Sequence, residues 1–354
     1  MNNGKVKKAI DTIGLPRIII ICFFLFMLIS ASALGLSIPA LLGDCLRRWG
    51  MYGVLVLAMV PAVQCGIGLN FGVSLGIVSG LVGALISIEA GISNPWLAIF
   101  IAMIIGVAIA SLVGIGYGFL LNKVKGSEMT VSTYVGFSVI AFMNIMWLSL
   151  PFKSGEIIWP LGGVGMRNTI SLASSFGEIF NKFGGFYIGK DLYVPTGLLI
   201  FFFIVCIIVW MFMRSKVGMA MSAAGANPGF ARSTGINVDK MRVLGTAVST
   251  ALGAVGIITY AQGYGFLQLY NAPLMLGFHC VAAVLIGGAS ISKAKISHVL
   301  LGTFLFQGLL AVALPVINKF LPESNLSDVL RIIISYGIIL YALSKTKGGR
   351  GSEQ

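Results

Sequence analysis

Long apolar stretches recur along almost the whole chain, and they constrain the fold more than any other feature. A helix needs about 20 mostly apolar residues to cross roughly 30 Å of hydrocarbon. Only 10% of the 354 residues are charged, against about 25% in soluble domains. The sequence therefore predicts an all-α polytopic membrane protein, with 1–354 as one transmembrane domain. Its ten candidate spans are 18–36, 50–66, 71–88, 96–121, 130–150, 194–212, 243–262, 274–291, 297–316 and 328–344.

The N-terminus is basic and runs directly into the first apolar stretch. This pattern also describes a cleavable signal peptide, with the small residues Ala-Ser-Ala at 31–33 near its end. Because many more predicted spans follow, we expect the stretch to remain in place as the first transmembrane helix. Residues 1–17 then form a cytoplasmic basic tail.

Lysine and arginine are distributed unevenly among the segments that join the predicted spans. With the N-terminus inside, 16 of the 24 Lys and Arg residues fall in cytoplasmic segments, in line with the positive-inside rule. Ten spans place the C-terminus in the cytoplasm too, and they make 151–193 an extracytoplasmic loop and 213–242 a cytoplasmic one. We therefore attribute the net charge of +13 to the enrichment of Lys and Arg on the cytoplasmic side of the membrane. We expect membrane lipid but no nucleic acid among the partners.

Residues 213–242 are the main polar run in this apolar sequence. The run carries five Lys or Arg residues and one acidic residue. Asn227-Pro228-Gly229 has the chemistry of a helix start, because Asn caps helices and Pro is tolerated in the first turn. We predict a short helix over about 228–234 that stops at Gly235 and exposes Phe230. Composition alone leaves a plain connecting loop as an equal alternative.

A resemblance favours the helix. The string AAGANPGFARSTGINVDKMR resembles the cytoplasmic loop of permease subunits in ABC importers of the ribose and simple-sugar group, within the superfamily of branched-chain amino acid and sugar permeases. In that family this loop forms the coupling helix, which docks on the ATPase. The resemblance implies an ATPase-coupling role for Ala224, Gly225, Asn227, Pro228, Ala231, Arg232, Gly235 and Asn237.

The resemblance also implies partners. A permease of this kind works with a separate ABC ATPase subunit, which consumes the ATP, and with an extracytoplasmic substrate-binding protein. Such importers present two permease halves to two ATPases, so we expect a dimer with a second copy or a paralogue. The chain itself would bind no cofactor or metal and would not be an enzyme. It would be a multi-pass protein of the bacterial cytoplasmic (inner) membrane.

Ionisable residues are expected to be scarce inside the spans. Ion-coupled carriers place Asp, Glu or His relays in the membrane. We expect the acidic residues of this chain, Asp44 among them, in loops or at span ends, and His279 as a packing residue within a span. No P-loop pattern occurs either. We therefore favour an importer permease, driven from outside the chain, over a stand-alone secondary carrier or facilitator of a small polar solute.

Neutral hydrogen-bonding side chains do occur in the spans. Such groups either hold helices together or line a wet path for an uncharged polar solute, and the sequence supports both interpretations equally. The candidates for a translocation path are Gln64, Asn70, Asn144, Gln262 and Gln307.

The segment before the third span departs from the sugar permeases that the loop resembles. Those proteins often read G-G-I-D-L-S-V-G there, whereas this chain reads CGIGLNFG, with Cys65, Gly68 and Asn70 in place of Gly, Asp and Ser. The solute therefore stays open among sugars, nucleosides, sugar-like signals and amino acids. The short separation of the second and third stretches also predicts a broken, cavity-lining segment there.

Two further patterns predict local packing. Consecutive G-x-x-x-G steps at Gly72, Gly76 and Gly80 predict close helix contact, within the subunit or across a dimer. Residues 168–183 predict an amphipathic helix that lies on the membrane or pore mouth, or packs on the span ends. Its apolar face would hold Ile170, Ala173, Phe176, Ile179, Phe180 and Phe183.

Overall fold

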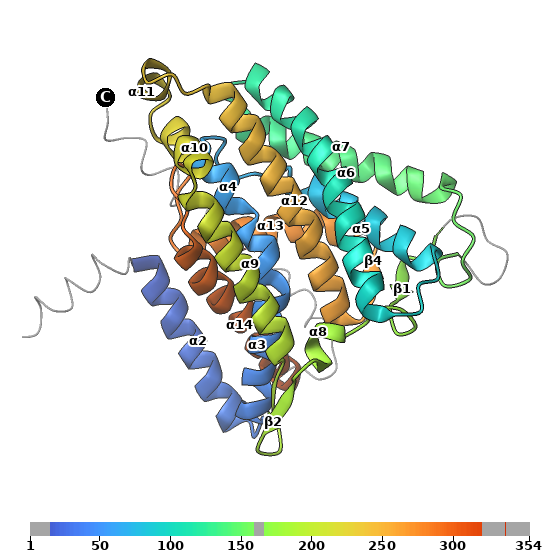
Figure 1. Ribbon diagram of the computed structural model, residues 1–354. Helices are drawn as coiled ribbons and strands as arrows, with labels where there is room; N and C mark the ends of the chain where they lie inside the picture. The colour runs from blue at the N-terminus through green and yellow to red at the C-terminus, as the bar shows by residue number, and fades with distance from the viewer. Residues whose placement is uncertain (1–14, 159–165, 321–336, 338–354) are drawn as a thin grey trace, which may run out of the picture.

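The computed structural model describes residues 15–158, 166–320 and 337 of the chain. Its helices run back and forth beside one another, and most of them are joined by short connections (Figure 1). In chain order the helices that form this bundle are α2 (Leu15–Ala33), α3 (Ile38–Leu57), α4 (Met59–Gln64), α5 (Val73–Glu89), α6 (Pro95–Lys123), α7 (Glu128–Ser149), α9 (Thr196–Arg214), α12 (Val238–Tyr264), α13 (Ala272–Ile286) and α14 (Ile296–Phe320).

Six helical segments in the described part of the chain are long and apolar enough to cross a membrane, counting α3 and α4 together as Ile38–Gln64. Three shorter apolar helices, Arg17–Ala33, Val73–Glu89 and Ala272–Ile286, lie on predicted spans as well. The polytopic helical fold is thus confirmed. Apart from residue 337, the predicted tenth span, 328–344, lies outside the described residues, as do the first 14 residues of the predicted basic tail. A count of ten spans stays a prediction.

The second span begins earlier than predicted. Ser37 caps α3 by accepting a hydrogen bond from the Ala40 N–H, and the helix then runs unbroken from Ile38, twelve residues before the predicted start at 50. Asp44 therefore lies in the second turn of a helix, about 9 Å from its start at 1.5 Å per residue, and not in a loop. Its expected place at the end of a span stays a prediction. Its carboxylate pairs with Arg47 at 3.0 Å, one turn away, and this pairing makes the charges tolerable there.

The outer segment is not the predicted amphipathic helix. Strand β1 (Thr169–Ser171) pairs antiparallel with β4 (Phe266–Gln268), and only α8 (Ile179–Lys182) is helical. Glu178, at φ 56°, breaks the backbone just before α8. The apolar face is divided accordingly, with Phe176 and Phe180 buried and Phe183 exposed. Strands β2 (Phe186–Ile188) and β3 (Leu192–Val194) form a hairpin, so two short sheets accompany an otherwise helical fold.

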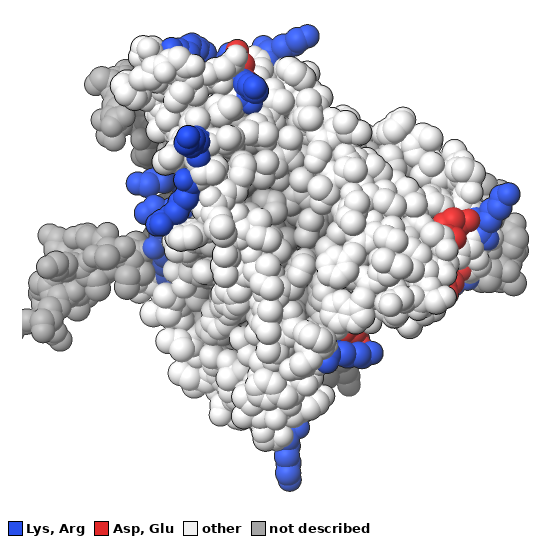
Figure 2. All heavy atoms as spheres, in the orientation of Figure 1, with Lys and Arg blue, Asp and Glu red and all other residues white. Residues whose placement is uncertain are grey.

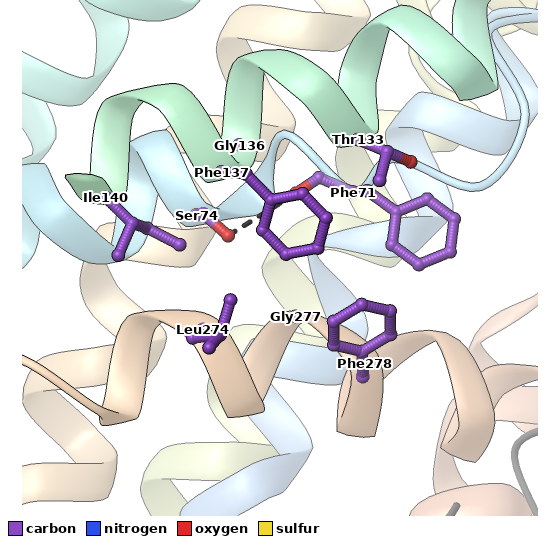
Figure 3. A pocket seen from close by; sticks show the side chains of 9 residues that line it. All are labelled: Phe71, Ser74, Thr133, Gly136, Phe137, Ile140, Leu274, Gly277 and Phe278. Carbon is purple, nitrogen blue, oxygen red and sulfur yellow. Dashed lines mark hydrogen bonds between the residues drawn. The ribbon is translucent and has the colours of Figure 1, made fainter. Parts of the chain in front are cut away.

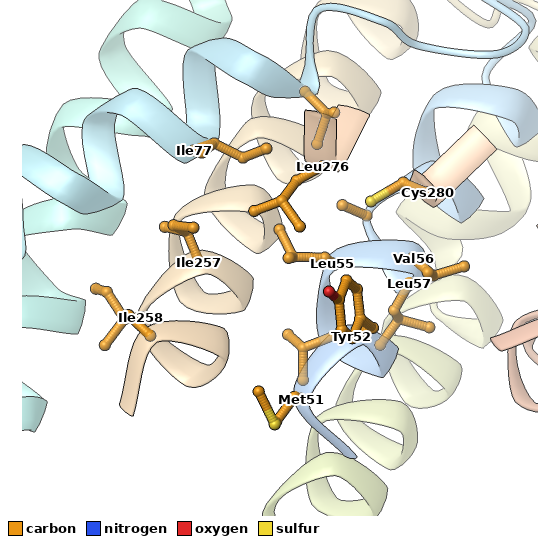
Figure 4. Packing of buried hydrophobic residues seen from close by; sticks show 14 of the residues in the cluster. Met51, Tyr52, Leu55, Val56, Leu57, Ile77, Ile257, Ile258, Leu276 and Cys280 are labelled. Carbon is orange, nitrogen blue, oxygen red and sulfur yellow. The ribbon is translucent and has the colours of Figure 1, made fainter. Parts of the chain in front are cut away.

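Helix α12 lies in the middle of the bundle and packs against α3, α5 and α6. Figure 4 shows the apolar core where α3, α5, α12 and α13 meet, with Leu55, Ile77, Ile257 and Leu276 pointing toward one another. The predicted glycine face explains how closely α5 approaches α12. A Cβ on Gly76 would lie 2.2 Å from the Thr250 carbonyl oxygen, so that the G-x-x-x-G face packs within the chain.

We predict that Gly76→Ala lowers the thermal stability of the detergent-solubilised protein, because the added methyl meets backbone atoms of α12 that cannot move aside. The expected loss is about 1–3 kcal/mol, as for other overpacked cores. Gly116→Ala is the matched control, since a Cβ at Gly116 of α6 meets nothing within 4 Å. Equal melting temperatures for the two variants would show that α5 and α12 are not in this close contact.

Candidate functional site

The polar run folds into a helical hairpin made of α10 (Lys216–Ala226) and α11 (Pro228–Ser233). Asn227 ends α10 and caps α11, its side chain accepting a hydrogen bond from the Phe230 N–H at 3.0 Å. Gly235, at φ 81°, takes the left-handed conformation that ends the helix. Asn237 then caps α12 through the Lys240 N–H at 2.9 Å. The predicted short helix and its stop are confirmed, while α10, capped by Ser215, was not predicted.

The small residues of the motif face the protein itself. Ala224 and Ala231 are buried against each other and against Val238. Gly225 lies on the end of α4, where a Cβ would come within 2.2 Å of the Gln64 carbonyl oxygen. These three positions therefore shape the hairpin and hold it against the bundle, since larger side chains would displace it.

The outer surface of the hairpin is formed by other residues. Pro228, Gly229 and Arg232 are exposed, and the Phe230 side chain is 62% exposed. Figure 1 shows α11 projecting at one end of the molecule, beyond the ends of the neighbouring helices. An exposed aromatic side chain next to an exposed guanidinium is typical of a protein contact surface.

We call the end of the molecule that carries this hairpin the basic end. It also holds the start of α2, the 123–128 connection and the 287–295 connection, which printed contacts link to one another. Figure 2 shows Lys and Arg side chains gathered around it. The rest of the described chain carries seven Lys or Arg residues and five acids. The basic end has only two acids, Glu128 and Asp239, against Arg17, Lys123, Lys125, Arg214, Lys216, Arg232, Lys240, Arg242, Lys293 and Lys295.

Both of these acids are used to fix the base of the hairpin. Arg242, buried in α12, donates to Glu128 at the start of α7 and, at 2.9 Å, to Asn122 of α6. The Glu128 carboxylate also accepts the Gly126 N–H at 2.8 Å. Lys125 pairs with Asp239 at 2.6 Å on the exposed side. Sequence patterns do not reveal this network, because the side chains that it joins between helices lie more than 100 residues apart.

The five candidate path residues are not brought together. Gln64 bonds to Ser222 and to the Ala294 carbonyl at the basic end. Asn70 is buried at the start of α5 and bonds to Ser249 and Tyr117. Near the opposite end, the Gln262 side-chain oxygen accepts the Phe180 N–H. Three of the five thus join segments of the fold.

The remaining two candidates keep unused hydrogen-bonding capacity. Gln307 of α14 is buried, and neither amide atom of its side chain has a hydrogen-bond partner. The side-chain oxygen of Asn144 in α7 also has none. His279, expected to be a packing residue, lies with its ring against Tyr52 and Phe306.

One small pocket lies between α5, α7 and α13 (Figure 3). Three aromatic rings, Phe71, Phe137 and Phe278, line it, with Ser74 as a polar group. The Ser74 hydroxyl bonds to the Pro273 carbonyl at 3.2 Å. The pocket has a free volume of about 10 Å³, which is roughly enough for one water molecule. In this conformation it is therefore too small for a sugar or nucleoside.

Comparison with known proteins gives one family. Residues 41–343 match the model of the family described as "Branched-chain amino acid transport system / permease component". The chain is 26% identical over 247 residues to the ribose import permease protein RbsC of Escherichia coli K12, covering 68% of this chain and 71% of that protein.

Two nucleoside ABC transporter permease proteins of Lactococcus lactis subsp. cremoris are similar too. NupB is 26% identical over 383 residues, covering 99% of this chain and 97% of NupB. NupC is 26% identical over 238 residues, covering 67% of this chain and 70% of NupC. No solved structure matches the chain.

The two ion pairs at the base of the hairpin predict different mutational effects. The side chains of Arg242 and Glu128 are 9% and 13% exposed, whereas those of Lys125 and Asp239 are 42% and 55% exposed. Arg242→Ala leaves the Glu128 carboxylate, which is largely enclosed by the protein, without its cation, and it is expected to reduce stability by about 3 kcal/mol. Lys125→Ala is expected to cost about 1 kcal/mol or less.

Thermal unfolding of the two variants in detergent compares these losses directly. If Arg242→Ala lost no more stability than Lys125→Ala, the pair of Arg242 and Glu128 would not be the better enclosed of the two.

Proposed function

Because the chain belongs to the family of branched-chain amino acid transport system permease components, we propose a role for each end of the molecule. The chain is the membrane-spanning permease subunit of an ABC importer, a transport protein and not an enzyme. It is a multi-pass protein of the bacterial cytoplasmic membrane. This membership favours the importer over the stand-alone carrier. ABC importer permeases work with an ATPase and a binding protein.

We propose that the basic end faces the cytoplasm. The support is the charge distribution, with ten Lys or Arg residues against two acids at that end, because cytoplasmic connections are enriched in Lys and Arg. The same orientation puts the hairpin of α10 and α11 where an ATPase works, and leaves ATP to be consumed by that partner. The N-terminus is then cytoplasmic as well, since α2 begins at the basic end.

The single observation that carries the docking proposal is the exposed tip of the hairpin. Phe230 and Arg232 point away from the bundle, while the motif residues Ala224, Gly225 and Ala231 are turned inward. We propose that α11 is the coupling helix and that Phe230 and Arg232 make its contact with the ATPase. Asn227, Pro228, Gly235 and Asn237 contribute by fixing the start and end of α11 and the start of α12.

The extracytoplasmic binding protein is proposed to dock on the opposite end. That end carries the β2–β3 hairpin, whose residues Phe186, Tyr187 and Ile188 are all largely exposed. An exposed aromatic patch at a molecular end is typical of an interaction surface.

We propose that the working importer contains two permease chains. One chain supplies one coupling hairpin, so a second permease chain is needed for a second ATPase. The chain is similar to both NupB and NupC, which come from one strain, and the second chain is therefore either another copy or a paralogue. Native mass spectrometry of the purified complex is expected to find two permease chains with two ATPase chains. A single permease chain per ATPase pair would exclude this assembly.

The proposed solute is an uncharged sugar or nucleoside. The relatives carry those names, and the unpartnered amide of Gln307 and side-chain oxygen of Asn144 can bond to hydroxyl groups. Cells that express the importer are expected to take up radiolabelled ribose or radiolabelled uridine, with no competition from leucine. Uptake of leucine instead would point to an amino-acid importer.

We predict that Phe230→Ala reduces co-purification of the ATPase at least tenfold, because aromatic anchors of interfaces are commonly worth about 2 kcal/mol or more. Phe186→Ala is the matched control, since its side chain is also largely exposed (49%, against 62% for Phe230) but lies at the opposite end. Both variants are expected to reach the membrane in normal amounts, because neither side chain is part of the core.

Retention of the ATPase by Phe230→Ala, or its equal loss in Phe186→Ala, would show that α11 is not the docking element. Ala231→Trp is less informative, since Ala231 is buried within the hairpin and a large side chain would disturb its packing.

A further inference from the structure

Gln64, the last residue of α4, joins three separate parts of the chain at the basic end. Its side-chain N–H donates to the Ala294 carbonyl at 2.7 Å. Its side-chain oxygen accepts the Ser222 hydroxyl of α10, also at 2.7 Å. Among the hydrogen bonds of the described residues, these two are the ones that join α4 to the 287–295 connection and α10 to a membrane-spanning helix.

The α10 side of this joint belongs to the hairpin that projects from the basic end. Ser222 precedes Asn227, the cap of α11, by five residues. Close backbone contact holds α10 in place, since a Cβ on Gly66 would lie 2.9 Å from the Cα of Gly225. Gly66 is at φ 83°, a conformation that side-chain-bearing residues rarely adopt. A displacement of α10 must therefore move the end of α4 or break this contact.

The Ala294 side of the joint leads into the bundle. Ala294 is buried in the connection between α13 and α14, where Ser290 and Lys293 pair through their backbones. Helix α13 packs in the same core as α3, the helix that α4 continues (Figure 4). Gln64 thus holds α10, α4 and the α13–α14 connection at one point.

Gln64 is also accessible to water. It lines a groove of about 430 Å³ together with Ser222, Ala226, Ser292, Lys293 and Lys295. When its amide is removed, water can replace it as the partner of Ser222 and of the Ala294 carbonyl. The fold therefore does not depend on this side chain in the way that it depends on the buried pair of Arg242 and Glu128.

We propose that Gln64 is a positioning residue of the transport cycle: it transmits movement of the α10–α11 hairpin to α4 and to the α13–α14 connection. This inference rests on the proposed docking of the ATPase at α11. It adds that the relay passes from Ser222 through the Gln64 amide to the Ala294 carbonyl.

The test measures coupling and assembly separately, in the permease–ATPase complex reconstituted into liposomes with its binding protein. Gln64→Ala and Ser222→Ala are expected to retain the ATPase and its basal hydrolysis, but to lower the solute transported per ATP about fivefold, which corresponds to about 1 kcal/mol. The double variant is expected to be no worse than Gln64→Ala alone, because both changes break one relay.

Conservative and control variants separate relay from packing. Ser222→Thr keeps the hydroxyl and is expected to transport as the wild type does. Gln64→Glu keeps the acceptor for Ser222 but turns an oxygen toward the Ala294 carbonyl, so that it should behave like Gln64→Ala. Ser32→Ala removes an exposed hydroxyl of α2, a helix that carries none of the relay or docking residues, and it should have no effect.

Unchanged transport per ATP in Gln64→Ala, or additive losses in the double variant, would overturn the relay. Loss of the ATPase in Gln64→Ala and Ser222→Ala would also overturn it, because the bond would then be structural. A wild-type chain that retains no ATPase would contradict the proposed function itself, and this inference with it.

Discussion

Backbone N–H and carbonyl groups cannot remain unpaired in hydrocarbon, and the interior of this protein is organised around meeting that requirement where helices break. Pro61 cannot donate to the preceding turn, and α3 gives way to α4 at Ala58. The Ser249 hydroxyl bonds the Ala58 carbonyl at 2.7 Å and accepts the Asn70 amide at 3.1 Å. Asn70 in turn accepts the Gly72 N–H and the Tyr117 hydroxyl. One buried network therefore stabilises two breaks, the one between α3 and α4 and the one between α4 and α5. Because Ser249 of α12 bonds to both, α12 lies beside them at the centre of the bundle.

In the hairpin at the basic end, different residues fix the helices and face a partner. Capping side chains and a left-handed glycine fix where its helices start and stop, and small residues allow it to lie directly on the end of α4. The residues available to a partner are then few, chiefly Phe230 and Arg232. Motif positions and contact positions alternate along α11, since neighbouring residues of a helix face different directions. A sequence motif in such a loop thus describes how the contact surface is held as much as what it touches.

Hydropathy predicted the spans because hydrocarbon imposes one uniform demand on every crossing helix. It placed the start of α3 too late, since charged residues paired one turn apart look like a loop to an apolar window. The prediction of a helix over 168–183 was wrong for another reason. The spacing of its apolar residues fits a helix, but residues 169–171 pair with a strand about 97 positions away. The Gln64 and Arg242 networks were equally invisible, because side-chain partners more than 100 residues apart leave no local pattern. The short helix of the candidate site was predictable because its caps are local.

The central claim is that α11 meets the ATPase. Photocross-linking measures that contact directly, with a benzophenone side chain in place of Phe230 and, as the reference position, in place of Phe186. The account predicts a covalent adduct between the permease and the ATPase from position 230 and none from position 186. Adducts with the ATPase from position 186, or with lipid alone from position 230, would contradict it.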